Sequence, residues 1–330
     1  MLPQPSTDLG TVATPVRPWV ADVLLLAVAV AWGSTYVVAK TLVSDDTVLA
    51  MLAVRMSATA FVLGILLVAL RRRLTRQALR VGALLGLLLS AVFVFETFGI
   101  SMTSATNAGV IISLTIILTP VLESVVGKRR LGAVFYFAGL LAVAGVYFLT
   151  TGGGLAAFGL GDGLILGASL VRSFHVVAMH RLSSGATIDS LGLTFVQMLT
   201  CGAVFLMFSS LWGRPAWAYA ASMGTSSTLW MAYLVIVCTV FPFFIQMWAV
   251  RTTSPTRVSL LLGTEPVWAA FIGVAVAGDH LGPSGILGVG LVLVGTMWGQ
   301  RLELRAPRAA DVLPTSAASG SPRRGGWSRR

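Results

Sequence analysis

Ten apolar stretches, each close to the length of a membrane-spanning helix, constrain this chain more than any other feature of its sequence. A helix needs about 20 consecutive apolar residues to cross the hydrocarbon core of a bilayer. Hydrophobic residues make up 56% of the 330-residue chain and charged residues only 11%, which excludes an ordinary soluble domain. We therefore predict an all-α membrane protein with ten transmembrane helices, because a helix satisfies its own backbone hydrogen bonds in lipid. The stretches cover residues 19–40, 48–70, 78–100, 104–126, 132–150, 163–182, 189–211, 228–250, 257–277 and 283–300.

The basic residues lie in short clusters and are divided unequally between the two sides of the predicted bundle. Most of the 23 lysine and arginine residues lie on the side of the N-terminus, in loops and in the tail at residues 301–330. The opposite side carries only Lys40 and Arg214. The positive-inside rule therefore predicts a multi-pass protein of the inner (plasma) membrane with both termini in the cytoplasm. The same rule explains the formal net charge of +11 better than a nucleic-acid partner does.

This orientation predicts the outcome of site-specific labelling in intact cells. Tags at Ser319 and within residues 71–80 should react only after the membrane is permeabilised, because the positive-inside rule places both segments in the cytoplasm. A tag near Ala220 should react from outside. Labelling of Ser319 in intact cells would contradict the predicted orientation.

The two halves of the chain repeat one another weakly but in order. Residues 22–42 align with residues 162–182 at a constant offset, and Arg55 then falls opposite Gln197. The monotony of apolar helices could give such a match by chance, but the ordered polar landmarks favour a duplication. Because five spans per half is an odd number, the second half must enter the membrane upside down, as in secondary transporters. We predict a cytoplasmic tail at 1–18, five-helix repeats at 19–150 and 151–300, and a basic disordered tail at 301–330.

Several short motifs recur in a fixed order along the chain, namely Trp32-Gly33-Ser34-Thr35, Arg55, Thr103-Ser104-Ala105 and Thr264-Glu265-Pro266-Val267. In order and spacing they resemble the ten-helix, EamA-type branch of the drug/metabolite transporter superfamily. The likeness covers roughly residues 19–300. It implies transport of small organic molecules, with spans 1–4 and 6–9 around the pathway and spans 5 and 10 at the periphery. One departure is Gly278-Asp279, where family members often carry Gly-Glu.

The acid Glu265 lies near the middle of the ninth span. It is about 13 Å along that helix, within a hydrocarbon core about 30 Å thick. An ionisable group at that depth is costly unless it faces protein or water. We therefore predict that Glu265 binds and releases a proton or a cationic group. A purely structural ion pair with Arg55 or Arg172 is the alternative.

Two prolines inside apolar spans are predicted to break helices, because proline cannot donate a backbone hydrogen bond. Pro266 follows Glu265 in the ninth span, and Pro120 lies in the fourth. With Ser104 aligned to Ser254, Pro120 comes about one helical turn later than Pro266. We therefore expect the two breaks at different depths.

Other polar side chains are predicted to face the same pathway. Arg55 lies too deep in the second span to reach the headgroups easily. Arg172 and His175 share one face of the sixth span, and the repeat matches them with Trp32 and Thr35. Such a set would suit an amphiphilic or anionic solute, although pairing with interior carboxylates for packing alone is the alternative. The predicted substrate-binding or coupling residues are Trp32, Thr35, Tyr36, Arg55, Glu96, Arg172, His175, Gln197, Gln246 and Glu265.

Three of these residues have an equally simple structural interpretation. Glu96 lies near the outer end of the third span, where a solvated carboxylate at the rim is also expected. Gln197 and Gln246 could line the pathway or bond to neighbouring helices. Two cysteines, Cys201 and Cys238, lie within apolar spans and are expected to be small core residues.

No pattern in the chain supports an enzyme, a metal or another cofactor. Three scattered histidines and two cysteines show no metal-ligand spacing, and there is no glycine-rich phosphate loop. We expect a secondary transporter of small organic metabolites, an exporter or exchanger working by alternating access. Its expected partners are the lipid bilayer and a small molecule, with protons and a second copy of the chain as further candidates. The alternative is a membrane-embedded scaffold or sensor, which would tolerate neutral replacement of Arg55, Arg172 and Glu265.

Overall fold

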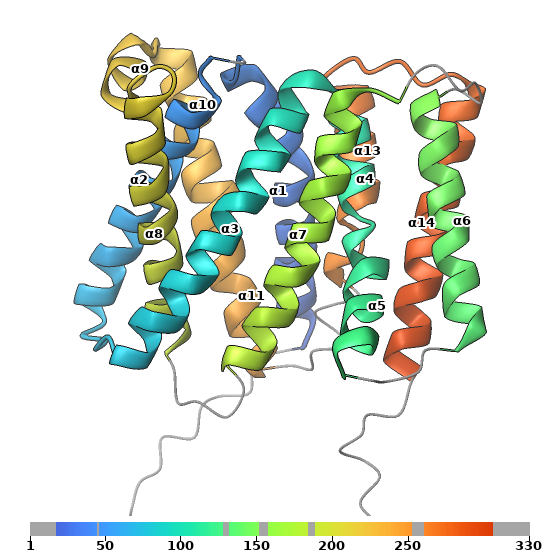
Figure 1. Cartoon of the computed structure of the whole chain (residues 1–330), viewed down its shortest axis with the longest axis horizontal. Coiled ribbons are helices and arrows are strands. Elements are labelled where there is room, and N and C mark those ends of the chain that lie inside the picture. The colour runs from blue at the N-terminus through green and yellow to red at the C-terminus, as the bar shows by residue number, and fades with distance from the viewer. Residues whose placement is uncertain are drawn as a thin grey trace, which may run out of the picture.

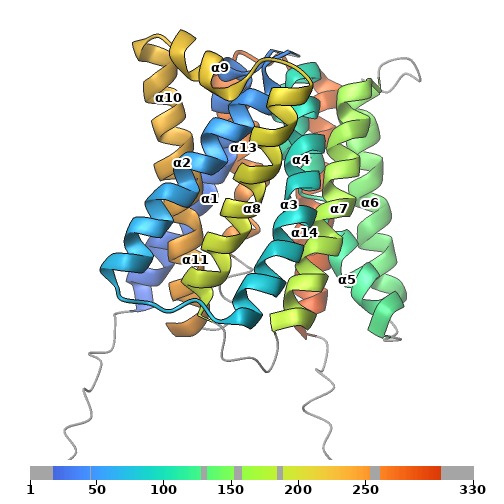
Figure 2. The same ribbon diagram turned by 60° about the vertical axis from the view of Figure 1, so that its left-hand side comes forward.

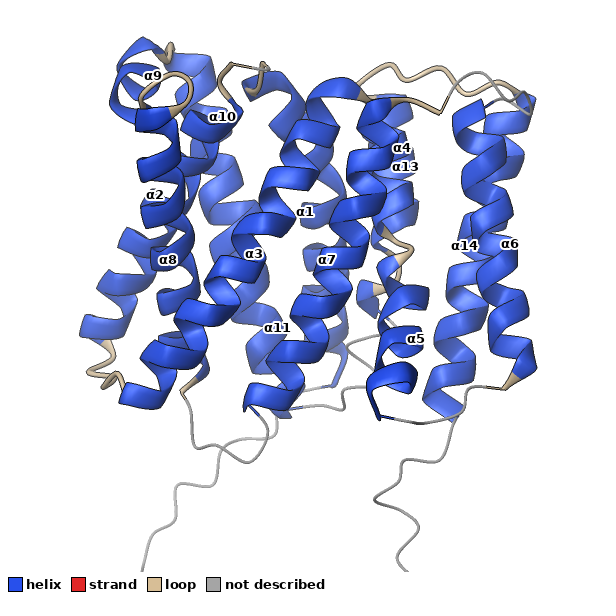
Figure 3. Cartoon of the chain, in the orientation of Figure 1, coloured by secondary structure: helices blue, strands red, loops and turns tan. Residues whose placement is uncertain are grey.

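Long helices run side by side between the two ends of the molecule (Figure 1). A computed structural model describes residues 18–44, 46–127, 132–151, 158–183, 189–252 and 261–305. Within these ranges the regular elements are helices, and no strand occurs (Figure 3). The predicted all-α membrane fold is therefore confirmed.

The helices follow the predicted spans closely. Seven helical stretches of the described part are long and apolar enough to cross a membrane, and the other three predicted spans correspond to shorter apolar helices. A short helix before the eighth span, α9, was not predicted. The elements are α1 (Pro18–Leu42), α2 (Val48–Ala69), α3 (Arg76–Met102), α4 (Ala105–Ile112), α5 (Thr115–Gly127), α6 (Ala133–Thr151), α7 (Leu160–Ser183), α8 (Ser190–Leu211), α9 (Ala216–Ser222), α10 (Thr225–Val235), a π-helical turn (Ile236–Val240), α11 (Phe241–Thr252), α13 (Glu265–Ala275) and α14 (Pro283–Arg305).

The second half of the bundle runs in the opposite direction to the first. In Figure 1, α1 begins at the lower end, whereas its counterpart α7 begins at the upper end. Helices of the two halves pack in pairs, α2 on α8, α3 on α7, and both α1 and α4 on α13. The α6–α14 pair stands at one edge of the bundle (Figure 1). The fifth and tenth spans are thus peripheral, as the family resemblance implies.

The fourth span is broken at residues 113–114, between α4 and α5. Pro120 lies inside α5, so the expectation that it marks the break is wrong. At the break the Ser113 hydroxyl donates to the Val110 carbonyl at 2.6 Å. The same carbonyl also accepts the Ser113 backbone N–H at 3.2 Å, so side chain and backbone of Ser113 both bond to it at the break.

The ninth span has an equivalent break. A turn at residues 263–264 precedes α13, and the Thr264 hydroxyl donates to the Leu261 carbonyl at 2.7 Å. Pro266 lies in the first turn of α13, where a missing amide hydrogen is tolerated. This turn follows the break at 113–114 by 150 residues, which is the offset of the repeat in this region. The two breaks therefore lie at equivalent depths, contrary to the expectation from the prolines.

The eighth span contains the π-helical turn Ile236–Val240. Here the Thr239 hydroxyl donates to the Leu234 carbonyl, five residues earlier, at 2.7 Å. The Cys238 thiol donates to the Ala31 carbonyl of α1 at 3.3 Å. Single π-helical turns inside α-helices occur frequently at functional sites. In this protein the turn places Cys238 and Thr239 on the inner side of the span.

Two aspartates hold the start of α4 at the end of the bundle opposite the arginine-rich loops. Asp279 accepts the Thr106 backbone N–H at 2.8 Å, and Asp162 accepts the Asn107 side-chain amide at 3.1 Å. A carboxylate near a helix N-terminus is stabilised by the helix dipole. Gly278 directly precedes Asp279 with φ of +72°, a conformation that favours glycine. Gly278-Asp279 thus departs from the Gly-Glu that family members often carry, but it still places an acid where it caps the start of α4.

Gly109 of α4 lies where that helix crosses α13 closely. A Cβ atom there would lie 2.2 Å from the Ala269 Cβ and 3.0 Å from the Tyr36 ring. We expect Gly109→Ala to lower the unfolding temperature of the detergent-purified protein, because such overpacking costs about 1–3 kcal/mol. Gly290→Ala in α14 is the matched control, since a Cβ atom there meets nothing within 4 Å. An unchanged unfolding temperature for G109A would show that α4 and α13 can move apart at this crossing without cost, so the close approach would not be required.

Candidate functional site

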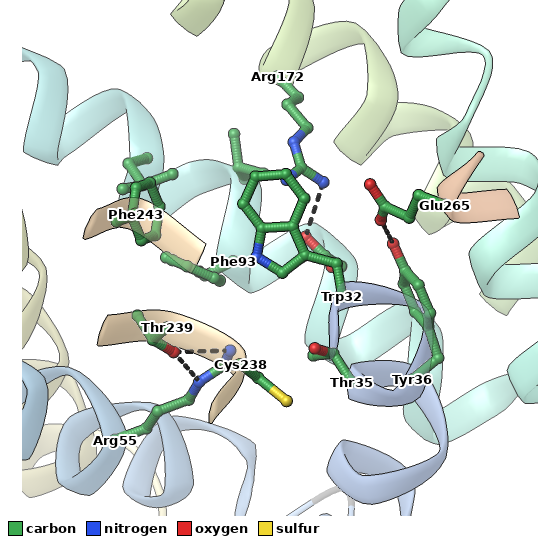
Figure 4. Close-up of a pocket in the computed structure, with 13 residues that line it drawn as sticks. Trp32, Thr35, Tyr36, Arg55, Phe93, Arg172, Cys238, Thr239, Phe243 and Glu265 are labelled. Atoms are coloured by element: carbon green, nitrogen blue, oxygen red, sulfur yellow. Dashed lines mark hydrogen bonds and ion pairs between the residues drawn. The ribbon is translucent and has the colours of Figure 1, made fainter. Parts of the chain in front are cut away.

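A cavity of about 50 Å³ lies inside the bundle, with walls from both halves of the chain (Figure 4). Helices α1, α2 and α3 supply the first half of its lining, and α7, the π-helical turn, α11 and α13 supply the second. Space for one water needs about 10–15 Å³, so the cavity admits a few waters but no organic metabolite. The lining residues are Trp32, Thr35, Tyr36, Arg55, Leu89, Val92, Phe93, Glu96, Arg172, Cys238, Thr239, Phe243 and Glu265.

Glu265 begins α13 and is held on one side by α1. The Tyr36 hydroxyl donates to Glu265 Oε1 at 2.9 Å. Tyr36 is itself buried, at 2% exposure, so its hydroxyl cannot easily turn to water instead. Figure 4 shows the second Glu265 carboxylate oxygen on the side of Arg172. The acid is therefore fixed by a neutral donor and directs its free oxygen to the cavity.

Arg172 of α7 forms the ion pair of the cavity. Its Nη1 lies 4.0 Å from Glu96 Oε2 of α3. The Arg172 guanidinium also attracts the Glu265 carboxylate electrostatically. Glu96 is buried, which favours the site interpretation over that of a solvated rim carboxylate. One arginine is thus shared between two acids from different halves of the chain.

Arg55 of α2 has a different environment. Its Nε and Nη2 donate to the Thr239 hydroxyl at 3.4 and 3.1 Å, and its guanidinium lies 5.6 Å from the centre of the Phe93 ring. Within the described part of the chain it forms no ion pair, although it is only 5% exposed. The structural pair between Glu265 and Arg55 therefore does not form. A buried guanidinium whose partners are neutral is costly unless an anion joins it.

The motif Trp32-Gly33-Ser34-Thr35 owes its residue types to three different contacts. Gly33 lets α1 approach α13 closely, because a Cβ atom there would lie 2.8 Å from the Ala269 amide nitrogen. Ser34 Oγ lies 2.9 Å from the hydroxyl of Tyr233 in α10. Trp32 lines the cavity and packs edge-on against Phe243, with ring centres 6.2 Å apart. The motif therefore joins α1 to the helices of the second half around the cavity.

The family model for the EamA-like transporter family matches this chain twice, at residues 19–151 and 159–298. The chain belongs to the EamA-like transporter family. It is therefore a multi-pass membrane protein of a family of transporters rather than of enzymes. The division into two repeats at residue 150 stays a prediction.

Relatives of this EamA-like protein carry the same general description. It is 27% identical over 287 residues to an uncharacterized transporter of Archaeoglobus fulgidus, a match that covers 84% of this chain and 85% of the relative. It is 26% identical over 302 residues to the uncharacterized inner membrane transporter YedA of Escherichia coli K12, covering 89% and 96%. A protein of known crystal structure has a TM-score of 0.59 at 16% identity, covering 88% of this chain and 100% of that one. At that identity the likeness concerns the fold alone.

The structure brings seven of the predicted site residues of this EamA-like chain to the cavity, namely Trp32, Thr35, Tyr36, Arg55, Glu96, Arg172 and Glu265. The other three lie elsewhere. His175 Nε2 lies 3.1 Å from Gln197 Oε1, and both side chains are buried away from the cavity lining. Gln246 in α11 is half-buried and does not line it either. The His175–Gln197 pair joins α7 to α8, as expected if these two side chains bond neighbouring helices rather than line the pathway.

Three cavity residues of the second half were not predicted as site residues. Cys238 was assigned to the core, and Thr239 and Phe243 were not considered. Their neighbours in the sequence are all apolar, and a π-helical turn leaves no pattern that periodicity could detect. The available signal was Pro242, which removes one amide from the middle of the eighth span.

Proposed function

We propose that this protein is a secondary transporter that moves small organic or amphiphilic molecules across the membrane by alternating access. The observation that supports this proposal is the cavity itself, where two acids and two arginines from both halves of an inverted bundle meet. Secondary transporters built from inverted repeats place their substrate site at such a repeat interface, near discontinuous helices. The breaks at residues 113–114 and 263–264 fit that pattern.

The lining suggests the chemistry of the substrate. Arg55, bonded to a neutral hydroxyl, can accept a carboxylate or another anionic group. The rings of Trp32, Phe93 and Phe243 offer an apolar wall for the rest of the molecule. We therefore favour an amphiphile with an anionic group. Because the cavity of about 50 Å³ is too small for such a molecule, the helices must separate when substrate binds.

Glu265 is the proposed coupling residue. Protonation of this carboxylate would release the attraction to Arg172, while the Tyr36 hydroxyl could still donate to the neutral acid. Arg172 would then pair with Glu96 alone. A change in one proton can thus redistribute the contacts between α3, α7 and α13. Export or exchange driven by a proton gradient is the corresponding mode of transport.

Transport by the purified full chain in liposomes tests this proposal. Liposomes would be loaded with amino acids, nucleosides or amphiphilic anions, and counterflow would be measured with and without a pH gradient. We expect saturable movement of at least one amphiphilic anion, accelerated by the gradient. If no solute of the panel moved while the protein remained folded, the scaffold or sensor interpretation would gain support. The scaffold or sensor interpretation also predicts that neutral replacement of both Arg172 and Glu265 leaves the role of the protein in the cell unchanged.

A further inference from the structure

A second, larger hollow lies between α2 and α8, apart from the central cavity. Its volume is about 910 Å³, and it shares no lining residue with that cavity. This is within the range of roughly 300–1,000 Å³ that ligand pockets occupy. Figure 2 shows α2 and α8 side by side, with the loop from α2 to α3 passing below them. The lining residues are Ser57, Ala60, Phe61, Gly64, Ile65, Leu67, Val68, Ala69, Leu74, Phe195, Leu199, Gly202, Ala203 and Leu206.

The groove, as we call the hollow lined by these residues, opens toward the hydrocarbon of the membrane. Ser57 is its only lining residue with a polar side chain. Several of the apolar side chains are exposed along it, including Phe61 at 70% and Val68 at 76%. Both helices are long and apolar enough to span a bilayer. Inside a membrane, the groove is therefore filled by something apolar.

Two glycines let α2 and α8 approach each other closely along the groove. A Cβ atom at Gly202 would lie 3.1 Å from the Ser57 hydroxyl oxygen, and one at Gly64 would lie 3.1 Å from the Phe195 ring. Larger side chains at these positions would extend into the groove or push the two helices apart. The two helices therefore touch at these two points, and the groove is the hollow beside these contacts.

One end of the groove is strongly basic. Val68, Ala69 and Leu74 line that end, and the loop that joins them carries Arg71, Arg72 and Arg73. Arg76 and Arg80 follow in the first turns of α3, and all five arginines are exposed. Within the described part of the chain none of them has an ion-pair partner. One acid, Asp189, lies directly before α8. By the positive-inside rule this end faces the cytoplasmic headgroups.

We propose that the groove binds an anionic glycerophospholipid, with an acyl chain between α2 and α8 and the phosphate on the arginines at residues 71–73. An apolar groove that ends in a basic cluster is complementary to a molecule with an apolar chain and an anionic head. Basic pockets on the cytoplasmic side of membrane proteins bind such headgroups. A zwitterionic lipid fits less well, because its ammonium group would lie among arginines. A second copy of this chain would bring like charges together, which is also unfavourable.

Native mass spectrometry of the detergent-purified full chain tests this proposal. Phosphatidylglycerol and phosphatidylcholine would be added in turn, and the fraction of protein with one bound lipid would be measured. We expect phosphatidylglycerol to bind more tightly, and a variant with glutamine at residues 71, 72 and 73 to bind it roughly ten-fold more weakly or worse. Arg181→Gln at the same end of the bundle is the matched control, since Arg181 lies on α7 and outside the groove.

A second variant tests the apolar part of the site. Ala203 is exposed and lines the groove, so Ala203→Phe should fill it and reduce binding of both lipids without disturbing the fold. Leu140→Phe in α6 is its control and should have no effect on lipid binding, because Leu140 is 67% exposed and lies outside the groove. Equal binding of the two lipids, or binding unchanged in both groove variants, would overturn the proposal. A dimer cross-linked through Ala203→Cys in liposomes would also overturn it, because the second copy would then occupy the groove. None of these outcomes depends on the proposed transport.

Discussion

Glu265→Gln is expected to abolish transport driven by a pH gradient while the protein still folds and inserts. Glutamine has the shape of glutamate, and its side-chain carbonyl can still accept the hydrogen bond from Tyr36 that the carboxylate accepts at 2.9 Å. It cannot take up or release a proton. We therefore expect gradient-driven transport in liposomes to fall to the level of empty liposomes, whereas exchange of substrate without a gradient should persist.

The control for this variant is Glu96→Gln, which removes the other acid of the cavity. Because Arg172 lies 4.0 Å from Glu96 and also attracts Glu265, losing Glu96 leaves Arg172 with one acid instead of two. We expect E96Q to transport more slowly but to keep its response to the pH gradient. If E265Q responded to the gradient as the wild type does, Glu265 would not be the coupling residue. A variant that only failed to fold would instead favour a structural role.

The sequence predicted the spans and most of the polar cavity, for identifiable reasons. Membrane helices are long and apolar, so α1, α2, α3 and α8 begin and end within a few residues of the predicted limits. An acid or arginine deep in such a helix must face the protein interior. That argument located Arg55 and Glu265, and the repeat match to Trp32 pointed to Arg172; all three line the cavity.

The partners of those side chains could not be predicted, because they depend on how helices pack. Arg55 bonds to Thr239 only because a π-helical turn places this hydroxyl on the inner side of its span. The break in the fourth span was assigned to Pro120, but it depends on position within the repeat and falls at residues 113–114. His175 carries a polar side chain on the same helix as Arg172, yet it bonds to Gln197. The type and position of a polar residue indicated how deep its side chain lies in the membrane, whereas helix packing determined which partner that side chain contacts.

Arg55→Gln is expected to raise the substrate concentration needed for half-maximal transport by roughly 10- to 100-fold for an anionic substrate. Hydrogen bonds to charged groups contribute about 1.5–3 kcal/mol, which corresponds to that range. The effect on a neutral analogue of the same substrate should be much smaller, since the analogue forms no ion pair with the guanidinium. For the anionic substrate, Arg55→Lys should give a half-maximal concentration between those of the wild type and R55Q, because lysine keeps the charge but loses the planar guanidinium. Concentration series in liposomes, with both substrates, measure the difference.

Thr239 provides the test of whether Arg55 acts on substrate or only on packing. Thr239→Val keeps the size of the side chain and the charge at Arg55, but removes the hydroxyl that accepts from Nε and Nη2. We expect T239V to weaken binding of the anionic substrate less than R55Q does, because a mispositioned guanidinium still attracts an anion. Thr239→Ser keeps the hydroxyl and should restore wild-type behaviour. If R55Q raised the half-maximal concentration equally for neutral and anionic substrates, Arg55 would only support the packing of α2 against the eighth span. The anionic group of the substrate would then bind elsewhere in the cavity.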